Sequence, residues 1–591
     1  MRNRNEIPQE YKWNLGDIFA SPEEWEKAYA ECDAAIPALA ALKGTLGDSA
    51  ESLCRAYDTV AAFDEKTARV GSYAFLGCAL DGGDAAFLRR RAMVVSLSVK
   101  AGTATAFFDP ELTAIPAEKL AEFLTYELLK KYAHLIDDST RLSAHVLDEK
   151  SESILAGIGK ITGTPSETYQ IFTDVEMKLP KTLGENGEEV GLTAGNFRVL
   201  RESEQKDVRD AAFCAMFGTY GAYKGTFASL YGGSVKQDNL KASLRGFPSA
   251  RAASLARSNV PESVYDSLIA AIRASVPLME RYLELRKRAL GLNALDVYDL
   301  YTPMVPALGW TVPYEEGKRL VLEAVKPLGE EYRSVIARAF DENWIDVYET
   351  PGKESGAFSS GVYGVHPFVK LNYSDTLDDA FTLAHELGHS MHSYLSSETQ
   401  PYALSGYKLL VAEVASTVNE VLLTKYLLSV ETDPKRRACV LNNFLEGFRT
   451  TVFRQTLFAE FEYRAHELEA SGTPLTADVL CGLYEELEKA YYPNAATRDE
   501  IKYEWAFIPH FYRAFYVYVY ATGFCSAVAI ASRIFETGEA ADYLRFLSTG
   551  GSDYPINELK IAGVDLTSPA VVESAMKEFE RTLAELEKLI K

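Results

Sequence analysis

The chain has 591 residues, of which 47% are hydrophobic and 25% are charged. These values are typical of a globular protein, and the length is too great for one simple core, so we expect a multi-lobed body. The formal net charge of −23 disfavours binding to nucleic acids and to anionic membrane surfaces.

The cysteines give no sign of a disulfide framework or of a cysteine zinc site. They are seven in number, scattered along the chain and never arranged as C-x-x-C, which is typical of reduced residues in a cytoplasmic protein. The first residues, Met1–Glu6, lead into no apolar stretch, so we expect no signal peptide and a cytoplasmic location. The sequence does not predict the oligomeric state.

The first third of the chain is predicted to be mainly helical. Residues 17–165 are amphipathic and rich in Ala, Leu, Glu and Lys, with breaks at Asp81-Gly82-Gly83 and Asp109-Pro110. Residues 176–193 alternate around Asn186-Gly187, which predicts a β-hairpin. Because a helical pattern resumes after the hairpin, we divide the chain into an N-terminal helical domain, residues 1–195, and a second domain, residues 196–591.

A short strand is predicted at Val365–Tyr373, after a loop at Pro303–Pro313 and a helix from about Tyr314 to Val325. Such a strand either presents its edge to an extended peptide or serves as scaffold, and the sequence leaves both readings open. His366 lies on this strand and would contact the peptide in the first case.

Residues 376 to about 396 are predicted to form a helix that carries His385-Glu386-Leu387-Gly388-His389. Thr376 and Asp379 match a capping box at its start. Residues four apart lie on one helix face, so His385 and His389 can bind one metal ion, and imidazole suits Zn²⁺. Glu386 lies about 100° around the helix, beside the metal, where it can take a proton from a bound water.

A catalytic zinc ion usually has three protein ligands, and Glu413 is the best third candidate. His392 shares a helix face with His385 but lies a further turn from His389. The metzincin pattern is excluded because Leu395 stands where that pattern needs histidine. Glu413 follows His389 by 24 residues, enough for a second helix to return antiparallel. Glu420 lies about 10 Å further along that helix, so we expect it to support a ligand.

The segment Ile508–Gly523 is unusually aromatic. If it is one helix, Tyr512, Tyr516 and Tyr520 share a face and Tyr518 lies opposite, as a core residue. Donors on such a face suit a site where negative charge grows on a carbonyl oxygen. The 19 uncharged residues from Ala514 to Ser532 approach the length of a membrane span, but their tyrosines and small polar residues favour a buried helix instead.

The combined motifs resemble the M3 family of zinc metallopeptidases, and within it the oligoendopeptidase F group. The M3 pattern H-E-x-G-H-x-x-H with a downstream Glu matches Gly388, His392 and Glu413. Further matches run along the whole chain: Glu6–Leu15, Leu371–Tyr373, Thr376–Asp379, Gly550–Ser552 and Ala562–Asp565. The resemblance implies a mainly α fold with two lobes around a deep channel, and a catalytic domain within residues 196–591. We expect a small β-sheet beside the H-E-x-x-H helix.

The same resemblance implies a zinc endopeptidase that cleaves short oligopeptides with one Zn²⁺ ion. Glu386 is then the general base on zinc-bound water and later gives the proton to the leaving amine. His510 with Tyr516 or Tyr520 would stabilise the oxyanion, while His392, His366 and Tyr512 would contact substrate. Two alternatives stay open: a peptidyl-dipeptidase of the same family, and a non-catalytic peptide-binding protein, which has no need for Glu386.

Overall fold

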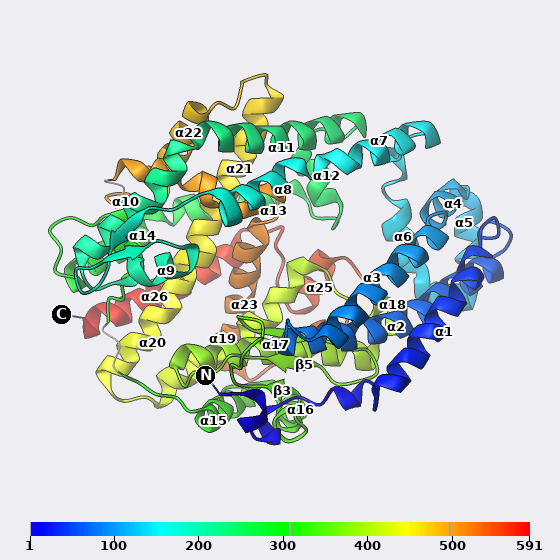
Figure 1. The fold of residues 1–591 in the computed structure, drawn as a ribbon, viewed down its shortest axis with the longest axis horizontal. Coiled ribbons are helices and arrows are strands. Elements are labelled where there is room, and N and C mark those ends of the chain that lie inside the picture. Colours follow the sequence, from blue (N-terminus) through cyan, green and yellow to red (C-terminus); the bar gives the residue numbers. More distant parts are fainter. Residues whose placement is uncertain (1, 306–308, 496–497, 591) are drawn as a thin grey trace. The chain divides into compact units, whose positions relative to one another are not determined.

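The computed structural model describes residues 2–305, 309–495 and 498–590, and these are mainly helical. They divide into two compact units built from discontinuous segments (Figure 1). Unit 1 comprises Met1–Ala144, Trp310–Tyr426 and Ile530–Val564, and unit 2 comprises His145–Gly309, Leu427–Ala529 and Asp565–Lys591. Neither unit coincides with residues 1–195 or 196–591, and the division at residue 195 stays a prediction. The loop predicted at Pro303–Pro313 includes residues 306–308, which lie outside the described residues.

The first segment of unit 1 is helical throughout. Its helices are α1 (Pro22–Ala40), α2 (Ala50–Leu80), α3 (Ala85–Thr105), α4 (Phe108–Ala114), α5 (Ala117–Phe123) and α6 (Ala133–Thr140). Two of these helices begin after a short polar residue whose side chain accepts a hydrogen bond from a backbone N–H of the first turn: Ser21 caps α1 and Asp84 caps α3. Trp25 is fully buried and its indole donates to the carbonyl of Val70 at 2.9 Å, which ties α1 to α2.

The remaining segments of unit 1 contain the strands and the helix with the two histidines. The elements are α15 (Tyr314–Ala324), α16 (Glu330–Asp341), β3 (Ile345–Asp346), β4 (Phe358–Ser360), β5 (Phe368–Lys370), α17 (Leu377–Thr399), α18 (Tyr402–Ser405), α24 (Ala541–Leu547) and α25 (Pro555–Ile561). Two more helices contain residues of both units, α19 (Leu409–Val430) and α23 (Tyr518–Thr537).

The three strands of unit 1 form one small sheet in the order β3-β5-β4. β5 runs parallel to β3 and antiparallel to β4, and all three of its residues are buried. The reading of this strand as a free edge is therefore wrong, because β5 has a neighbour on each side. The edge next to α17 belongs to β4, whose Ser359 Oγ lies 2.8 Å from Ser390 Oγ of α17. Figure 1 shows β5 beside α17.

The N-terminal segment is fastened to this sheet. Arg4 and Lys353 both pair with the buried carboxylate of Asp346 on β3, at 2.6 and 2.7 Å. The carbonyl of Tyr11 accepts from the backbone N–H of Val347 at 3.0 Å. A buried carboxylate with two cationic partners is compensated for its loss of water, whereas a lone one is not. Arg4 and Tyr11 of the N-terminal segment therefore have a structural role, because they support β3 and the residue that follows it.

Unit 2 is also helical and contains the predicted hairpin. Its helices are α7 (Glu149–Thr162), α8 (Thr164–Ile171), α9 (Ala194–Glu202), α10 (Lys206–Ala222), α11 (Lys224–Leu244), α12 (Ala250–Ala256), α13 (Glu262–Ala274), α14 (Val276–Ala289), α20 (Pro434–Gly447), α21 (Arg454–Ala470), α22 (Ala477–Tyr491) and α26 (Ala570–Leu589). The hairpin pairs β1 (Lys181–Leu183) with β2 (Glu189–Gly191), and Gly187 supplies the positive φ of its turn.

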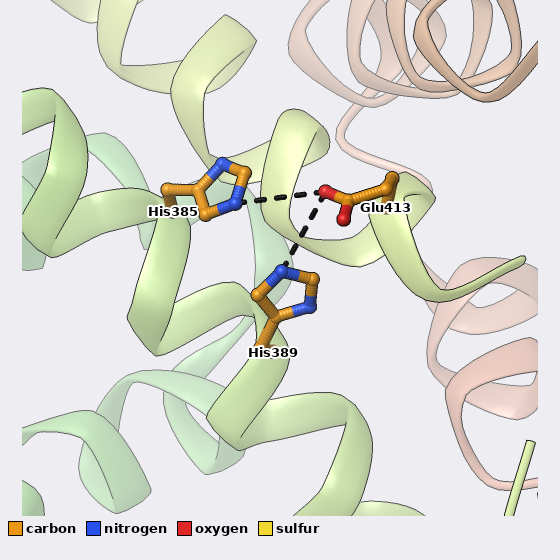
Figure 2. A group of neighbouring side chains, drawn as sticks. All are labelled: His385, His389 and Glu413. Carbon is orange, nitrogen blue, oxygen red and sulfur yellow. Dashed lines mark ion pairs between the residues drawn. The ribbon is translucent and has the colours of Figure 1, made fainter. Parts of the chain in front are cut away.

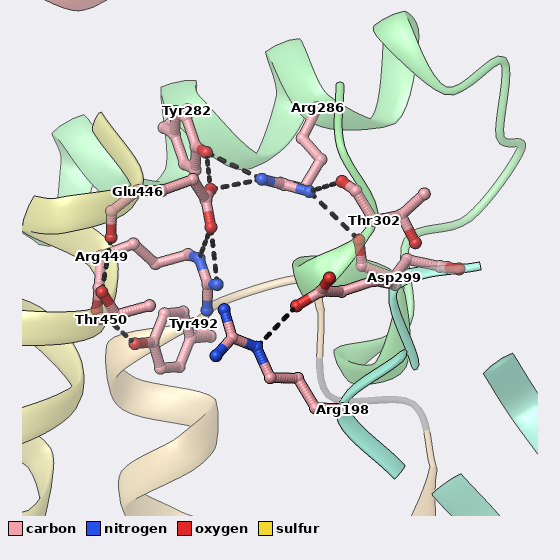
Figure 3. A network of polar contacts seen from close by, with 10 residues as sticks. Arg198, Tyr282, Arg286, Asp299, Thr302, Glu446, Arg449, Thr450 and Tyr492 are labelled. Carbon is pink, nitrogen blue, oxygen red and sulfur yellow. Dashed lines mark hydrogen bonds and ion pairs between the residues drawn. The ribbon is translucent and has the colours of Figure 1, made fainter. Parts of the chain in front are cut away.

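A buried ionic network holds α14 and α20 together in unit 2 (Figure 3). Glu446 accepts hydrogen bonds from Tyr282 and Arg286 of α14, and from Arg449 Nε at 3.0 Å. Burial alone would raise the pKa of Glu446, but Arg286 and Arg449 hold it at about 2. Removing one partner would leave a buried charge uncompensated, so this network has the properties of a structural element.

Among the described residues, one helix is long and apolar enough to cross a membrane, α23 at Tyr518–Thr537. Of its most apolar window, 72% is buried inside the protein. The core helix of a globular protein meets the same criteria of length and composition. This agrees with the expectation of a buried helix.

Candidate metal and catalytic site

The helix α17 begins at the predicted capping box. Thr376 Oγ1 accepts from the backbone N–H of Asp379 at 3.1 Å, and Asp379 Oδ2 accepts from the backbone N–H of Thr376 at 2.9 Å. Asp375 precedes the cap with a φ of 62°, which turns the chain into the helix. The helix therefore starts at a defined residue, and this start sets which face carries His385 and His389.

Three donor groups meet on one side of α17. His385 Nε2 and His389 Nε2 each lie 3.6 Å from Glu413 Oε2 (Figure 2). The donor atoms of these three residues lie within 4.8 Å of one another. Ligands at about 2.0–2.1 Å from a tetrahedral zinc ion stand about 3.3 Å apart, so the two imidazoles and the carboxylate fit that ion. The structure thus brings together the three residues predicted as metal ligands.

Gly388 is the reason that α19 can approach α17 so closely. A Cβ added at Gly388 would lie 2.5 Å from the carbonyl oxygen of Ala415 and 2.6 Å from Cα of Ser416, both in the backbone of α19. Any side chain at position 388 would therefore push the two helices apart. Because Glu413 is on α19, the glycine in the middle of the motif controls the distance between the carboxylate and the histidines.

A buried amide also joins the two helices. Asn419 of α19 is fully buried, and its Nδ2 donates to the carbonyl of Ala384 at 3.1 Å. Its Oδ1 accepts from the hydroxyl of Tyr332 on α16 at 3.0 Å. Sequence reasoning missed both residues. The available signal was a polar residue on the otherwise apolar part of a helix, which is costly to bury without partners.

Glu420 orients one of the two histidines. Its Oε1 lies 2.5 Å from His385 Nδ1, on the opposite side of the ring from Glu413. A proton on Nδ1 shared with Glu420 leaves Nε2 as the lone-pair nitrogen for a metal. Burial lowers the pKa of His385, but the hydrogen bond and charge of Glu420 outweigh it and raise the value to about 9. The supporting position of Glu420 agrees with the expectation from helix geometry.

Glu386 lies in a different environment from Glu413. Its side chain is only 7% exposed, and burial raises its pKa to about 7, against the opposing effect of His385 and with the help of Glu413. The ammonium group of Lys370 on β5 also acts on it, but that group is itself bound by the carbonyls of Glu354 and Ser355. A carboxylate with a pKa near neutrality can both accept and donate a proton at physiological pH.

The residues predicted to contact substrate have mostly packing contacts. His392 is fully buried and stacks on Tyr407 with ring centroids 3.7 Å apart. His366 stacks on Trp344, and its ring nitrogens lie within 3.1 Å of the Pro367 carbonyl and of Asp17. Tyr512 packs on Tyr169 at 4.7 Å. These contacts give the three residues structural roles, and their roles in substrate binding stay predictions.

The aromatic segment belongs to unit 2, and it is not one helix. A short 3₁₀ helix, Pro509–Tyr512, is followed by irregular backbone, and α23 begins only at Tyr518. The helical phase predicted from Tyr512 to Tyr520 is therefore wrong. Phe515 has a φ of 56°, a conformation that is uncommon for a bulky residue and that needs support from its surroundings.

That support comes from two residues that sequence reasoning missed. The buried Glu462 of α21 accepts from the backbone N–H of Phe515 at 2.7 Å, and Ser254 Oγ donates to the carbonyl of Ala514 at 3.1 Å. Both lie far away in sequence, so no local pattern marks them.

The residues that were predicted to stabilise the oxyanion nevertheless lie close to one another. The rings of His510 and Tyr516 are parallel, with centroids 6.5 Å apart, and Tyr520 is 5.2 Å from Tyr516. Tyr518 is buried and packs on Tyr265, so it is the core residue that was expected, although the continuous helix behind that expectation is absent from the described segment. Burial and the charge of Arg513 lower the pKa of His510.

The site combines the imidazoles of His385 and His389 with the carboxylate of Glu413, and the buried carboxylate of Glu386 lies on the same helix as the histidines. This arrangement defines the site of an H-E-x-x-H metallopeptidase. The comparisons agree with this class. The model of Peptidase family M3 matches residues 199–578, and a second model, Oligopeptidase F, matches residues 111–178. The chain therefore belongs to peptidase family M3 and is a metalloendopeptidase.

Two bacterial relatives match the whole chain, and a solved structure matches nearly all of it. The oligopeptidase PepF of Bacillus subtilis is 43% identical over 100% of this chain and 88% of its own length. The oligoendopeptidase F homolog of Lactococcus lactis is 41% identical over 100% and 99%. The crystal structure of oligoendopeptidase-F from Enterococcus faecium has a TM-score of 0.75 and 38% identity, covering 96% of this chain and 99% of that one.

Proposed function

We propose that the chain is a zinc endopeptidase that hydrolyses short oligopeptides within a restricted channel. The observation that carries the proposal is the meeting of His385, His389 and Glu413 with donor atoms within 4.8 Å of one another, beside the buried Glu386. When bound, Zn²⁺ lowers the pKa of a coordinated water and polarises a carbonyl group. The names of the relatives that match the whole chain, oligopeptidase and oligoendopeptidase, support peptides as substrates.

Glu386 is the proposed general base. It accepts a proton from the attacking water and gives it to the leaving amine, a task that suits a carboxylate with a pKa of about 7. Glu420 has no part in the proton transfer, because its carboxylate is engaged by His385 Nδ1. His510 with Tyr516 or Tyr520 is proposed to stabilise the oxyanion, and the clustering of their three rings supports a shared task.

The edge strand β4 is a suitable place for the main chain of a peptide. Among the described strands, β4 pairs only with β5, so its other edge is unpaired, and its residues are half-buried beside α17. Main-chain hydrogen bonds along such an edge would hold peptides of many sequences in an extended form.

A mass-spectrometric digest of a defined peptide library tests the proposal. The zinc-loaded protein should cut interior bonds of short peptides, a chelator should stop the cleavage, and folded proteins should resist it. Glu386→Gln should keep its zinc and lose turnover by at least about 10³-fold, because the amide cannot accept the proton. Loss of zinc in this variant, or a near-normal kcat, would overturn the role of Glu386.

The two alternatives have their own outcomes in the same digest. Peptides with a C-terminal amide are still cut by an endopeptidase, whereas a peptidyl-dipeptidase needs the free carboxylate. Bound zinc with no turnover of any peptide would favour the non-catalytic peptide-binding protein.

A further inference from the structure

Unit 1 contains a cavity of about 580 Å³ that starts on the same face of α17 as the metal ligands. His385, His389, Ser393 and Ser397 follow one another at intervals of four residues, and the last two line the cavity. A helix rises 1.5 Å per residue, so these serines stand about 6 and about 12 Å beyond His389 along the helix axis. The cavity is also lined by Gly361, the residue that follows the edge strand β4. Its volume is in the range of binding sites for small groups, about 300–1,000 Å³.

The wall of the cavity is aromatic. Four tyrosines line it: Tyr57, Tyr363, Tyr402 and Tyr407. They are held by contacts of their own, because Tyr402 donates to the carbonyl of Asp64 at 3.1 Å and Tyr363 donates to the carbonyl of Gln400 at 3.0 Å. The face of an aromatic ring attracts ammonium and guanidinium groups, so a wall of tyrosine rings suits a cation.

The charged residues that line the cavity all come from α2, and they leave it with a net negative charge. They are Asp64, Glu65 and Arg69. Arg69 is already engaged, by the carbonyl of Tyr363 at 3.2 Å and by Glu65 at 3.9 Å. Within the part of the chain that the structure describes, no cation forms an ion pair with the exposed Asp64. The cavity therefore combines aromatic rings with one carboxylate that lacks a counter-charge.

We infer that this cavity is a subsite for a positively charged group of the peptide substrate, with Asp64 as the residue that sets the preference. The inference rests on the proposed endopeptidase function. An extended peptide advances about 3.3 Å per residue, so the distances along α17 place the charged group about two to four residues from the bond that is cut. The group is a Lys or Arg side chain or the N-terminal ammonium, which share the same charge chemistry.

Scanned peptides test the inference and separate the two sources of charge. The probes are internally quenched nine-residue peptides of Ala, Gly and Leu with both termini blocked, carrying one Lys or one acetyl-lysine at each position in turn. Acetyl-lysine keeps the length of the side chain and removes the charge. A second series has no Lys and a free N-terminus. Mass spectrometry locates the cut in every peptide.

The wild-type enzyme should cleave peptides with Lys about 3- to 10-fold more efficiently, in kcat/KM, than the same peptides with acetyl-lysine, because the charge lowers KM. This preference should occur only at positions two to four residues from the cleaved bond, and only on one side of that bond. Asp64→Asn should reduce this ratio to near one, and Asp64→Lys should invert it. Glu26→Gln is the matched control, because Glu26 is an exposed carboxylate on α1 that does not line the cavity, and it should leave the ratio unchanged. The preference should also weaken in high salt.

The outcomes separate this inference from the function on which it rests. Zinc-dependent cleavage of the uncharged peptides supports the endopeptidase whichever way the ratio falls. The subsite is overturned if the wild-type enzyme shows neither a preference for Lys at any position nor a preference for the free over the blocked N-terminus, or if Asp64→Asn leaves the observed preference intact. If only the free N-terminus carries the preference, the cavity binds the N-terminal ammonium. If no peptide is cut, both inferences fail.

Discussion

Replacing Glu420 by alanine should weaken metal binding without removing a ligand. Glu420 holds His385 through Nδ1 at 2.5 Å, and the loss of such a support typically lowers metal affinity by about 10- to 100-fold. Replacing Glu413 removes one of three donors instead. If the binding free energy of a protein zinc site is about 10–16 kcal/mol and is shared among its ligands, one ligand contributes about 3 kcal/mol or more. That corresponds to a loss of at least about 100-fold.

The two variants can be ranked by competition with a fluorescent chelator for Zn²⁺ at fixed pH. Glu398→Ala is the control, because Glu398 is exposed on the same helix as the histidines and should leave the affinity unchanged. A thermal unfolding curve for each apo variant shows that the fold is intact. The reasoning is refuted if Glu420→Ala loses as much affinity as Glu413→Ala, or if Glu413→Ala keeps the affinity of the wild type.

Three further predictions concern the oxyanion residues, the helix contact and a buried acid. Tyr516→Phe should lower kcat and kcat/KM by about 10²–10³-fold with little change in KM, while Tyr518→Phe changes neither; an effect of Tyr518 alone would contradict the assignment. Gly388→Ala should separate α17 from α19 and lower both the Tm and the zinc affinity. The control Gly102→Ala, at an open helical position, should leave the zinc affinity intact and leave the Tm unchanged or raise it. Equal Tm changes in the two variants would count against the close contact between the helices. Burial holds the pKa of Glu462 well above its ordinary value of 4.5, so its contribution to stability is complete below about pH 4.5 and is lost as the pH rises towards the folded-state pKa. The neutral Glu462→Gln should therefore gain Tm relative to the wild type between pH 5 and pH 8, and a constant difference would argue against a protonated Glu462.

The features that the sequence determined by itself depend on neighbours within a few residues. The spacing of His385, Glu386 and His389 places their side chains because a helix has a fixed period, and the cap at Thr376 marks where that helix begins. The hairpin at Asn186-Gly187 is equally local, since its short loop needs a positive φ at Gly187, which glycine adopts readily. Such features form in any fold that contains the same helix or hairpin, because they depend only on neighbouring residues.

The tertiary structure decided the features that depend on distant partners. β5 is a central strand because β3 and β4 reach it from more than twenty and from about ten residues upstream, and no pattern within β5 shows whether a neighbour will be present. The break before Tyr518 depends on Glu462, 53 residues away, which holds the backbone of Phe515.

The metal site lies between these two cases. Glu413 could be chosen as a ligand from its spacing, but its distance from the histidines depends on the contact that Gly388 permits and on the Asn419 hydrogen bond. These are properties of two packed surfaces. A periodic pattern records which face of a helix is buried, and it does not record how closely the partner helix approaches.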